Sequence, residues 1–140
     1  MFDLKVGIVI PTYNGGDIWK QTASILSLSN SSHTVLVIDS TSSDDTVDVA
    51  LKHGFNVKVI SSIDFNHGGT RNLGINEIDV DIVVFLTQDA IPSVGCIEKI
   101  VAAFSDENIA CAYGRQLPHK NANAIAAHAR YYNYTENSYI

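Results

Sequence analysis

Polar side chains follow the first of several short apolar segments, and their types suit a ligand that is both flat and charged. The group consists of Pro11, Thr12, Tyr13 and Asn14, and two glycines come directly after it. Tyr13 offers a ring and a hydroxyl, while Thr12 and Asn14 offer short polar groups. The glycines let the backbone approach a bound molecule closely.

Three charged residues follow the next apolar segments and extend this chemistry. Asp39 offers acceptor oxygens that suit the N–H edge of a base or the hydroxyls of a ribose. Arg71 offers a cationic fork for phosphate oxygens. Asp89, the last residue of Thr87-Gln88-Asp89, offers a hard oxygen ligand for a divalent cation. Base, phosphate and metal partners together indicate a nucleoside diphosphate with Mg²⁺ or Mn²⁺.

Each of these residues also has a purely structural interpretation. Asp39 can equally form a turn or cap a helix, and Arg71 can pair with a neighbouring carboxylate. Asp44 and Asp45 are expected to cap the helix that follows them, and His67 is expected to be structural. Asp89 is the hardest to explain in this way. It follows the most hydrophobic segment, and an unpaired carboxylate at a largely buried edge is costly.

The apolar segments alternate with segments of helical spacing, which predicts an α/β fold with a mostly parallel sheet and flanking helices. Near-continuous β-branched runs are typical of strands covered on both faces. In such sheets ligands bind at the carboxyl ends of the strands, so the polar segments should converge there. The expected strands are 5–10, 34–39, 57–60, 82–86 and a weaker one at 109–113; the expected helices are 17–28, 45–53, 69–78 and 93–105, with a further helical stretch in 121–130.

Composition excludes several classes of protein. The chain has 140 residues, 46% of them hydrophobic, and a net charge of −6, which argues against a nucleic-acid binding surface. No apolar run approaches the roughly 20 residues that a membrane helix needs. The first residues lack the features of a secretory signal, and two cysteines are too few for a disulfide scaffold, so we expect a reduced, cytoplasmic setting.

Short catalytic motifs exclude further classes. The sequence has no Walker motif, no Gly-x-Gly-x-x-Gly after the first strand, no Gly-x-Ser-x-Gly and no Cys-x-x-Cys. A phosphotransfer receiver domain needs paired acidic residues after the first strand and an aspartate after the third. The residues found there, 11–13 and 61–62, do not meet that need.

Three segments in order resemble the family-2 glycosyltransferases of the GT-A fold. They are Ile8-Val9-Ile10-Pro11-Thr12-Tyr13-Asn14-Gly15, the run 37–46 with Asp39 and Asp44, and Phe85-Leu86-Thr87-Gln88-Asp89-Ala90 at the place of the Asp-x-Asp metal motif. Segments 65–72, 87–90 and 113–116 are similar to the rhamnosyltransferase-like branch. Two positions depart from the family pattern: only the final carboxylate of Asp-x-Asp remains, and Ser40 replaces a common acidic residue.

The resemblance implies transfer of a sugar from a nucleotide-sugar donor, with inversion, to a polysaccharide or lipid-linked acceptor. The branch suggests a dTDP-L-rhamnose-like donor and a cytoplasmic site, including the inner face of a membrane. By position, Asp89 would hold Mg²⁺ or Mn²⁺. The donor-binding residues would be Pro11, Thr12, Tyr13, Asn14, Asp39, Arg71 and Gln88.

Family members are longer than this chain, which leads us to expect a donor-binding domain at 1–114 and, at 115–140, the start of an acceptor-binding region. No residue matches the family's general base: Glu136 is the one acidic residue after Glu107. We therefore expect a fragment truncated before the acceptor half, inactive alone and able to self-associate as a homo-oligomer. The alternative is a non-enzymatic α/β module that binds a nucleotide or a partner.

Overall fold

The computed structural model describes residues 4–28 and 33–137. The chain divides into two compact units, Met1–Glu98 and Lys99–Ile140. The boundary falls inside helix α4 (Cys96–Ala102). The larger unit contains every residue predicted to bind the donor or a metal.

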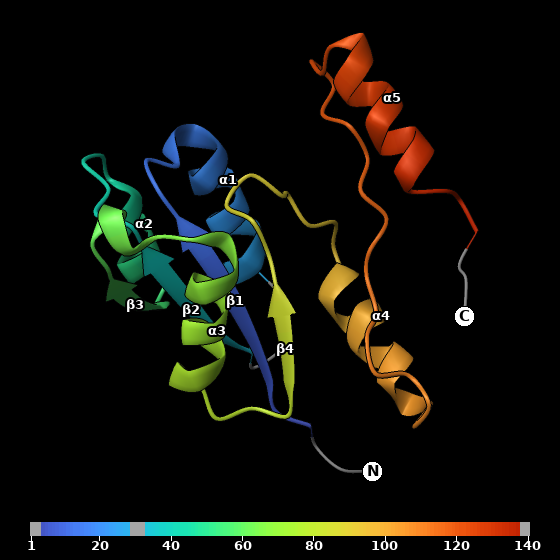
Figure 1. Ribbon diagram of the computed structural model, residues 1–140, viewed down its shortest axis with the longest axis horizontal. Coiled ribbons are helices and arrows are strands. Elements are labelled where there is room, and N and C mark those ends of the chain that lie inside the picture. Colours follow the sequence, from blue (N-terminus) through green and yellow to red (C-terminus); the bar gives the residue numbers. More distant parts are fainter. Residues whose placement is uncertain (1–3, 29–32, 138–140) are drawn as a thin grey trace. The chain divides into compact units, whose positions relative to one another are not determined.

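The larger unit is built on a parallel sheet (Figure 1). In the described part of the chain its strands are β1 (Val6–Thr12), β2 (Thr34–Asp39), β3 (Asn56–Val59) and β4 (Ile82–Phe85), in the order β3-β2-β1-β4. Central β1 pairs with β2 and β4 on its two sides, and Ile8 lies opposite Val35 and Val84. The α/β class and the first four expected strands are confirmed.

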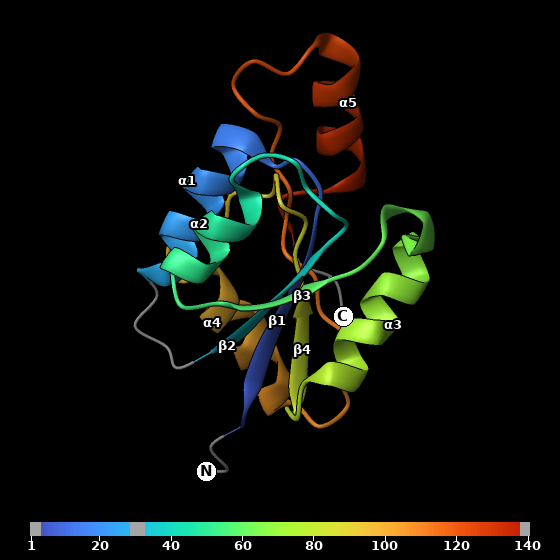
Figure 2. The same ribbon diagram turned by 90° about the vertical axis from the view of Figure 1, so that its left-hand side faces the viewer.

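Helices cover both faces of this sheet. Figure 2 shows α1 (Gly16–Ser27) and α2 (Thr46–Lys52) on one face and α3 (His67–Glu77) on the other. Asn66 caps α3 by accepting a hydrogen bond from the Gly69 N–H at 2.6 Å. Gly54, at φ +76°, follows the end of α2 and donates to the Leu51 carbonyl.

The core lies between the sheet and these helices, because β1 and β2 are apolar on both faces. On the α3 side, Val9, Leu36 and Ile38 are buried against partly buried Leu73 and Ile78. Gly74 allows α3 to pack closely here, since a Cβ at this position would overlap Val9 Cγ1. On the opposite side, the buried residues include Ile8, Ile10, Val37, Trp19, Ala23 and Ala50.

The smaller unit contains the end of α4, a 3₁₀ turn (Ala103–Ser105) and α5 (Ala124–Asn133). The helical stretch expected at 121–130 is confirmed, and it extends to Asn133. Asn123 caps it by accepting from the Ala126 N–H at 2.9 Å. The rings of Tyr113 and Tyr134 meet edge to face at 6.3 Å.

Two expectations about this region are wrong. Residues 109–113 form no strand, and Ile109 instead donates its N–H to the Asp106 carbonyl in a turn. Only Ile109 and Ala112 of the segment are even partly buried, and an apolar run without a partner strand cannot form a ladder. The helix expected from residue 93 begins at Cys96, because Gly95 at φ +73° has a conformation that no right-handed helix accepts.

No helix in the described part of the chain is long and apolar enough to cross a membrane.

Candidate functional site

The carboxyl ends of β1, β2 and β4 open onto a cavity of about 440 Å³. The segment 62–71, which contains a 3₁₀ turn (Ser62–Asp64) and the start of α3, closes another side. The lining residues are Pro11, Thr12, Tyr13, Ser40, Ser62, Phe65, His67, Arg71, Thr87 and Gln88. The polar segments predicted to converge on this edge do so. Of the predicted donor-binding residues, five line the cavity: Pro11, Thr12, Tyr13, Arg71 and Gln88.

The loop after β1 is held in a fixed, uncommon conformation. Asn14 has φ 44°, in the left-handed backbone region that residues other than glycine rarely adopt. Its N–H donates to Ser42 Oγ at 2.8 Å, and its side-chain oxygen accepts from the Ser43 N–H at 2.8 Å. Asn14 does not line the cavity; it joins the β1 loop to the β2 loop.

Gln88 holds the same loop from the β4 side. Its Oε1 accepts from the Tyr13 N–H at 2.8 Å, and its Nε2 donates to the Tyr13 carbonyl at 3.1 Å. Tyr13 lines the cavity with a side chain that remains 55% exposed. The main chain of the β1 loop is therefore fixed while its ring stays open to a ligand.

Asp39 is hydrogen-bonded within a turn, which is the structural alternative to ligand binding that the sequence allowed. It is 1% exposed and is absent from the cavity lining. Its carboxylate accepts from Thr12 Oγ1 at 2.9 Å, from the Ser42 N–H at 2.7 Å and from Ser42 Oγ at 2.5 Å. Asp39 thus shapes the turn after β2, and its burial keeps the carboxylate from direct contact with a ligand in this conformation.

The cationic and aromatic side of the cavity comes from the start of α3. The Phe65 and His67 rings meet edge to face at 5.2 Å. Arg71 is half-buried and donates from NH1 to the His67 carbonyl, one helical turn earlier, at 2.8 Å. This bond leaves other guanidinium N–H groups for a ligand beside the two rings.

Asp89 follows β4 as expected, but its surroundings differ from those that the sequence analysis assumed. The side chain is exposed rather than buried, because the Thr87–Ala90 turn at the end of β4 faces solvent. The expected cost of an unpaired buried carboxylate therefore does not arise, and that part of the argument is wrong. Among the residues described, no three His, Cys, Asp or Glu side chains gather to hold a metal ion.

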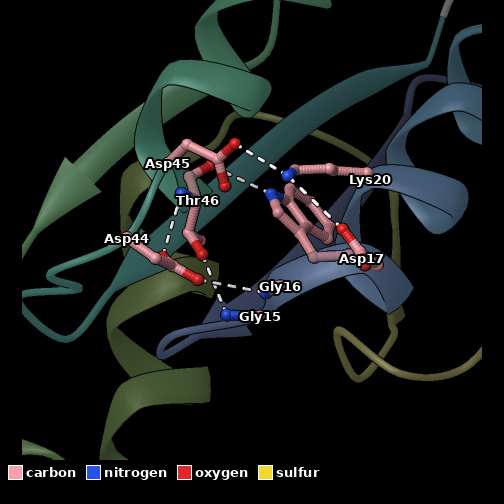
Figure 3. A network of polar contacts seen from close by, with 8 residues as sticks. Gly15, Gly16, Asp17, Lys20, Asp44, Asp45 and Thr46 are labelled. Carbon is pink, nitrogen blue, oxygen red and sulfur yellow. Dashed lines mark hydrogen bonds and ion pairs between the residues drawn. The ribbon is translucent and has the colours of Figure 1, made fainter.

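A polar network behind the site joins the first turns of α1 and α2 (Figure 3). Thr46 Oγ1 accepts from the Gly15 N–H at 2.8 Å, and Asp44 accepts from the N–H groups of Gly16 and Thr46. Hydrogen bonds from Thr46, its side chain first, and from the Gly16 N–H lower the pKa of the Asp44 carboxyl. Asp45 instead pairs with Lys20 of α1 at 2.8 Å, which raises the pKa of that lysine.

The expectation that both aspartates cap α2 is met by Asp44 alone. Its Oδ1 accepts the Thr46 N–H at 3.0 Å at the start of the helix. Asp45 occupies the N-cap position, but its side chain makes no capping hydrogen bond and points to Lys20.

Five lining residues were not among those predicted to bind the donor: Ser40, Ser62, Phe65, His67 and Thr87. All of them lie in the segments that follow strands, and this position in the sequence was the feature by which they could have been predicted. Ser40 is 3% exposed, and its Oγ has no hydrogen-bond partner within the described structure. A buried hydroxyl without a partner at the wall of a cavity marks a place where the protein's own hydrogen bonding is incomplete.

A parallel sheet with a cavity at its carboxyl edge is the arrangement in which open α/β domains bind ligands. The sequence model for glycosyl transferase family 2 matches residues 7–139, and the chain belongs to this family. The chain is 44% identical over 142 residues to the O-antigen chain rhamnosyltransferase RfbN of Salmonella typhimurium. That similarity covers 98% of the chain and 45% of the relative, so the chain spans under half of the relative's length.

Solved glycosyltransferases share the fold. The structure of residues 1–349 of TarS from S. aureus has a TM-score of 0.61 at 23% identity, covering 83% of this chain and 39% of that one. The mannosyltransferase PcManGT of Pyrobaculum calidifontis, in complex with GDP-Man and Mn²⁺, has a TM-score of 0.67 at 18% identity, covering 78% and 34%. The expected GT-A fold and the resemblance to the rhamnosyltransferase branch are both confirmed.

Proposed function

We propose that this chain forms the donor-binding part of an inverting glycosyltransferase that transfers L-rhamnose from a nucleoside diphosphate to a polysaccharide or lipid-linked acceptor. The observation that carries the proposal is the cavity at the carboxyl edge of β1, β2 and β4, which combines aromatic rings with Arg71. The choice of sugar and acceptor is supported by the name of the 44% identical relative. We propose the cytoplasmic side of a membrane as the place of reaction.

The lining residues divide by chemistry. The rings of Tyr13 and Phe65 offer apolar faces to a base, and Arg71 offers charge to a diphosphate. Thr12 and Asn14 support the site through the β1 loop, and Asp39 supports it through its three hydrogen bonds to Thr12 and Ser42. The protein thereby presents a rigid binding surface, and the diphosphate of the ligand carries most of the charge at the site.

Asp89 suits a divalent cation that shares its ligands with the substrate. Mg²⁺ in particular is often held by one or two carboxylates together with substrate phosphates and water. Asp89 supplies one exposed carboxylate beside the cavity-lining Gln88, and the described residues add no cluster around it. When bound, Mg²⁺ or Mn²⁺ would offset the charge that develops on the leaving diphosphate. We therefore expect the metal to bind with the nucleotide and weakly without it.

The transfer itself joins the acceptor oxygen to the anomeric carbon as the bond from that carbon to the diphosphate oxygen breaks. The acceptor's proton must pass to a general base. Glu136, the one carboxylate after Glu107, pairs with Arg115 at 3.6 Å in the smaller unit. We propose that the base belongs to the part of the relatives that this chain does not match, and that residues 1–114 bind the donor while 115–140 begin the acceptor region.

Calorimetric titration of the chain with dTDP and UDP, with and without Mn²⁺, tests the proposal. We expect binding that Mn²⁺ strengthens and that Asp89→Asn weakens about tenfold or more. Asp48→Asn removes the same charge from an exposed position on α2 and should bind like the native chain. Absence of nucleotide binding, together with no consumption of nucleotide sugar by a chain extended to its relatives' length, would favour a non-enzymatic partner-binding module.

A further inference from the structure

The side-chain amide of Gln88 makes two hydrogen bonds with the main chain of a single residue, Tyr13, which lies 75 positions earlier. One end accepts from the Tyr13 N–H at 2.8 Å and the other donates to the Tyr13 carbonyl at 3.1 Å. The pair imitates one rung of a sheet beyond the end of β1 and β4, whose last paired residues are Val9 and Phe85.

The two hydrogen bonds determine what Gln88 can offer a ligand. A glutamine amide has two donors and one acceptor oxygen, and one donor and the oxygen face Tyr13. The oxygen also lies 3.2 Å from the position of a Cβ built on Gly15, so the absence of a side chain there leaves room for it. The geometry favours support of the β1 loop over direct recognition of the nucleotide.

The opposite side of this loop is already fixed by the β2 turn. The next residue, Asn14, exchanges hydrogen bonds with Ser42 and Ser43. Gln88 is thus the link that ties the Tyr13 peptide to the β4 turn, which also contains Asp89. Loss of that link frees the main chain from which the exposed Tyr13 ring enters the cavity wall.

We propose that Gln88 is a positioning residue, which fixes the Tyr13 peptide through a reciprocal hydrogen-bonded pair and so holds the aromatic wall of the nucleotide cavity in its binding conformation. This inference rests on the proposed function of the cavity. The pair requires one donor and one acceptor at position 88. A carboxyl group placed there tests this requirement, because it can donate only when it is protonated.

Gln88→Glu makes the test, because a carboxylate accepts the Tyr13 N–H but cannot donate to the Tyr13 carbonyl. At pH 7.5 one glutamate oxygen would face a carbonyl oxygen with no proton between them. A protonated glutamic acid regains the donor and with it the reciprocal pair. We expect dTDP affinity, relative to the native chain at the same pH, to fall about tenfold or more at pH 7.5 and to recover to within about threefold at pH 4, below the ordinary glutamate pKa of about 4.3.

Two further variants separate the alternatives. Gln88→Met has a similar length but neither donor nor acceptor, so it should bind weakly at both pH values. Gln21→Glu makes the same change of charge at an exposed position on α1 and should follow the native chain throughout. Thermal unfolding of every variant checks that the fold persists. The recovery of dTDP affinity at low pH compares Gln88→Glu with itself, so a general loss of folding cannot produce it.

The outcomes distinguish the proposed function of the cavity from the positioning role of Gln88. A native chain that binds neither dTDP nor UDP contradicts the proposed function. A native chain that binds, with Gln88→Glu and Gln88→Met binding equally well, shows that Gln88 does not position the loop. Equal weakness of Gln88→Glu at both pH values, with the fold intact, also overturns the positioning role and indicates direct contact with the nucleotide.

Discussion

The indole Nε1 of Trp19 donates a hydrogen bond to the main-chain carbonyl of Thr46 at 2.9 Å, and both residues are fully buried. The bond joins the first turns of α1 and α2, directly behind the loops that follow β1 and β2. In the same place Thr46 Oγ1 accepts from the Gly15 N–H. The two loops therefore share a common support, and the shape of the cavity wall depends on it.

Trp19→Phe should destabilise the fold by about 1–3 kcal/mol. Phenylalanine leaves the Thr46 carbonyl without its donor and leaves a small void where the indole packed against Phe55, whose ring centre lies 6.4 Å away. Urea unfolding followed by far-ultraviolet circular dichroism measures the change, since Trp19 is the chain's one tryptophan and its fluorescence is lost. A change below about 0.5 kcal/mol would show that the bond contributes little.

The strands and the edge at which ligands bind could be predicted because both depend on local pattern. Continuous β-branched runs such as 35–38 are typical of strands buried on both faces, and alternation with helices favours parallel pairing, in which the carboxyl ends of the strands meet. The run 109–113 has weaker apolar character, and a local pattern does not reveal whether a partner strand exists. That is why its prediction as a strand was wrong.

Residue types alone could not tell a ligand-binding side chain from one that supports the site. Asp39 has the chemistry to bind a base, yet it is buried and its carboxylate accepts three hydrogen bonds from Thr12 and Ser42. Phe65 and Ser40 line the cavity without having the charged chemistry that drew attention to Arg71. Such assignments depend on long-range contacts, which chain order and spacing do not specify.

Gly74→Ala tests the close packing of α3 on the sheet. Alanine favours a helix over glycine by about 1 kcal/mol, but its Cβ would overlap Val9 Cγ1 and lie 3.2 Å from Ile38 Cδ1. We expect net destabilisation of about 1–3 kcal/mol, because both neighbours are fully buried and cannot move away freely. Gly68→Ala is the matched control on the same helix, since a Cβ there meets nothing within 4 Å. Urea unfolding should show Gly68→Ala to be neutral or stabilising, and a similar loss in both variants would contradict the packing argument.

The stability of the fold at acid pH should depend on Asp44. Hydrogen bonds from Thr46 and Gly16 lower the pKa of this carboxyl in the folded chain. A carboxyl with a lowered folded pKa contributes stability above its ordinary pKa of about 3.9 and loses it as the pH falls through the folded value. Asp44→Asn should therefore be less stable than the native chain at pH 6, and the difference should shrink below about pH 4.

Thermal midpoints measured from pH 6 to pH 2 check this prediction. Asp48→Asn, at an exposed position on α2, controls for the removal of one negative charge. A difference between Asp44→Asn and the native chain that stays constant over the whole range would show that the charge of Asp44 does not contribute.

Arg71→Ala should weaken dTDP binding about tenfold or more, because it removes the one cationic side chain among the residues that line the described cavity. Arg71→Lys keeps the charge but loses the planar fork that the His67 carbonyl orients, so it should restore only part of the affinity. Arg130→Ala, at an exposed position on α5, is the matched control. Titration with thymidine beside dTDP then locates the contact. A loss confined to dTDP places Arg71 at the diphosphate, an equal loss for both places it at the base, and unchanged affinity for both removes Arg71 from the site.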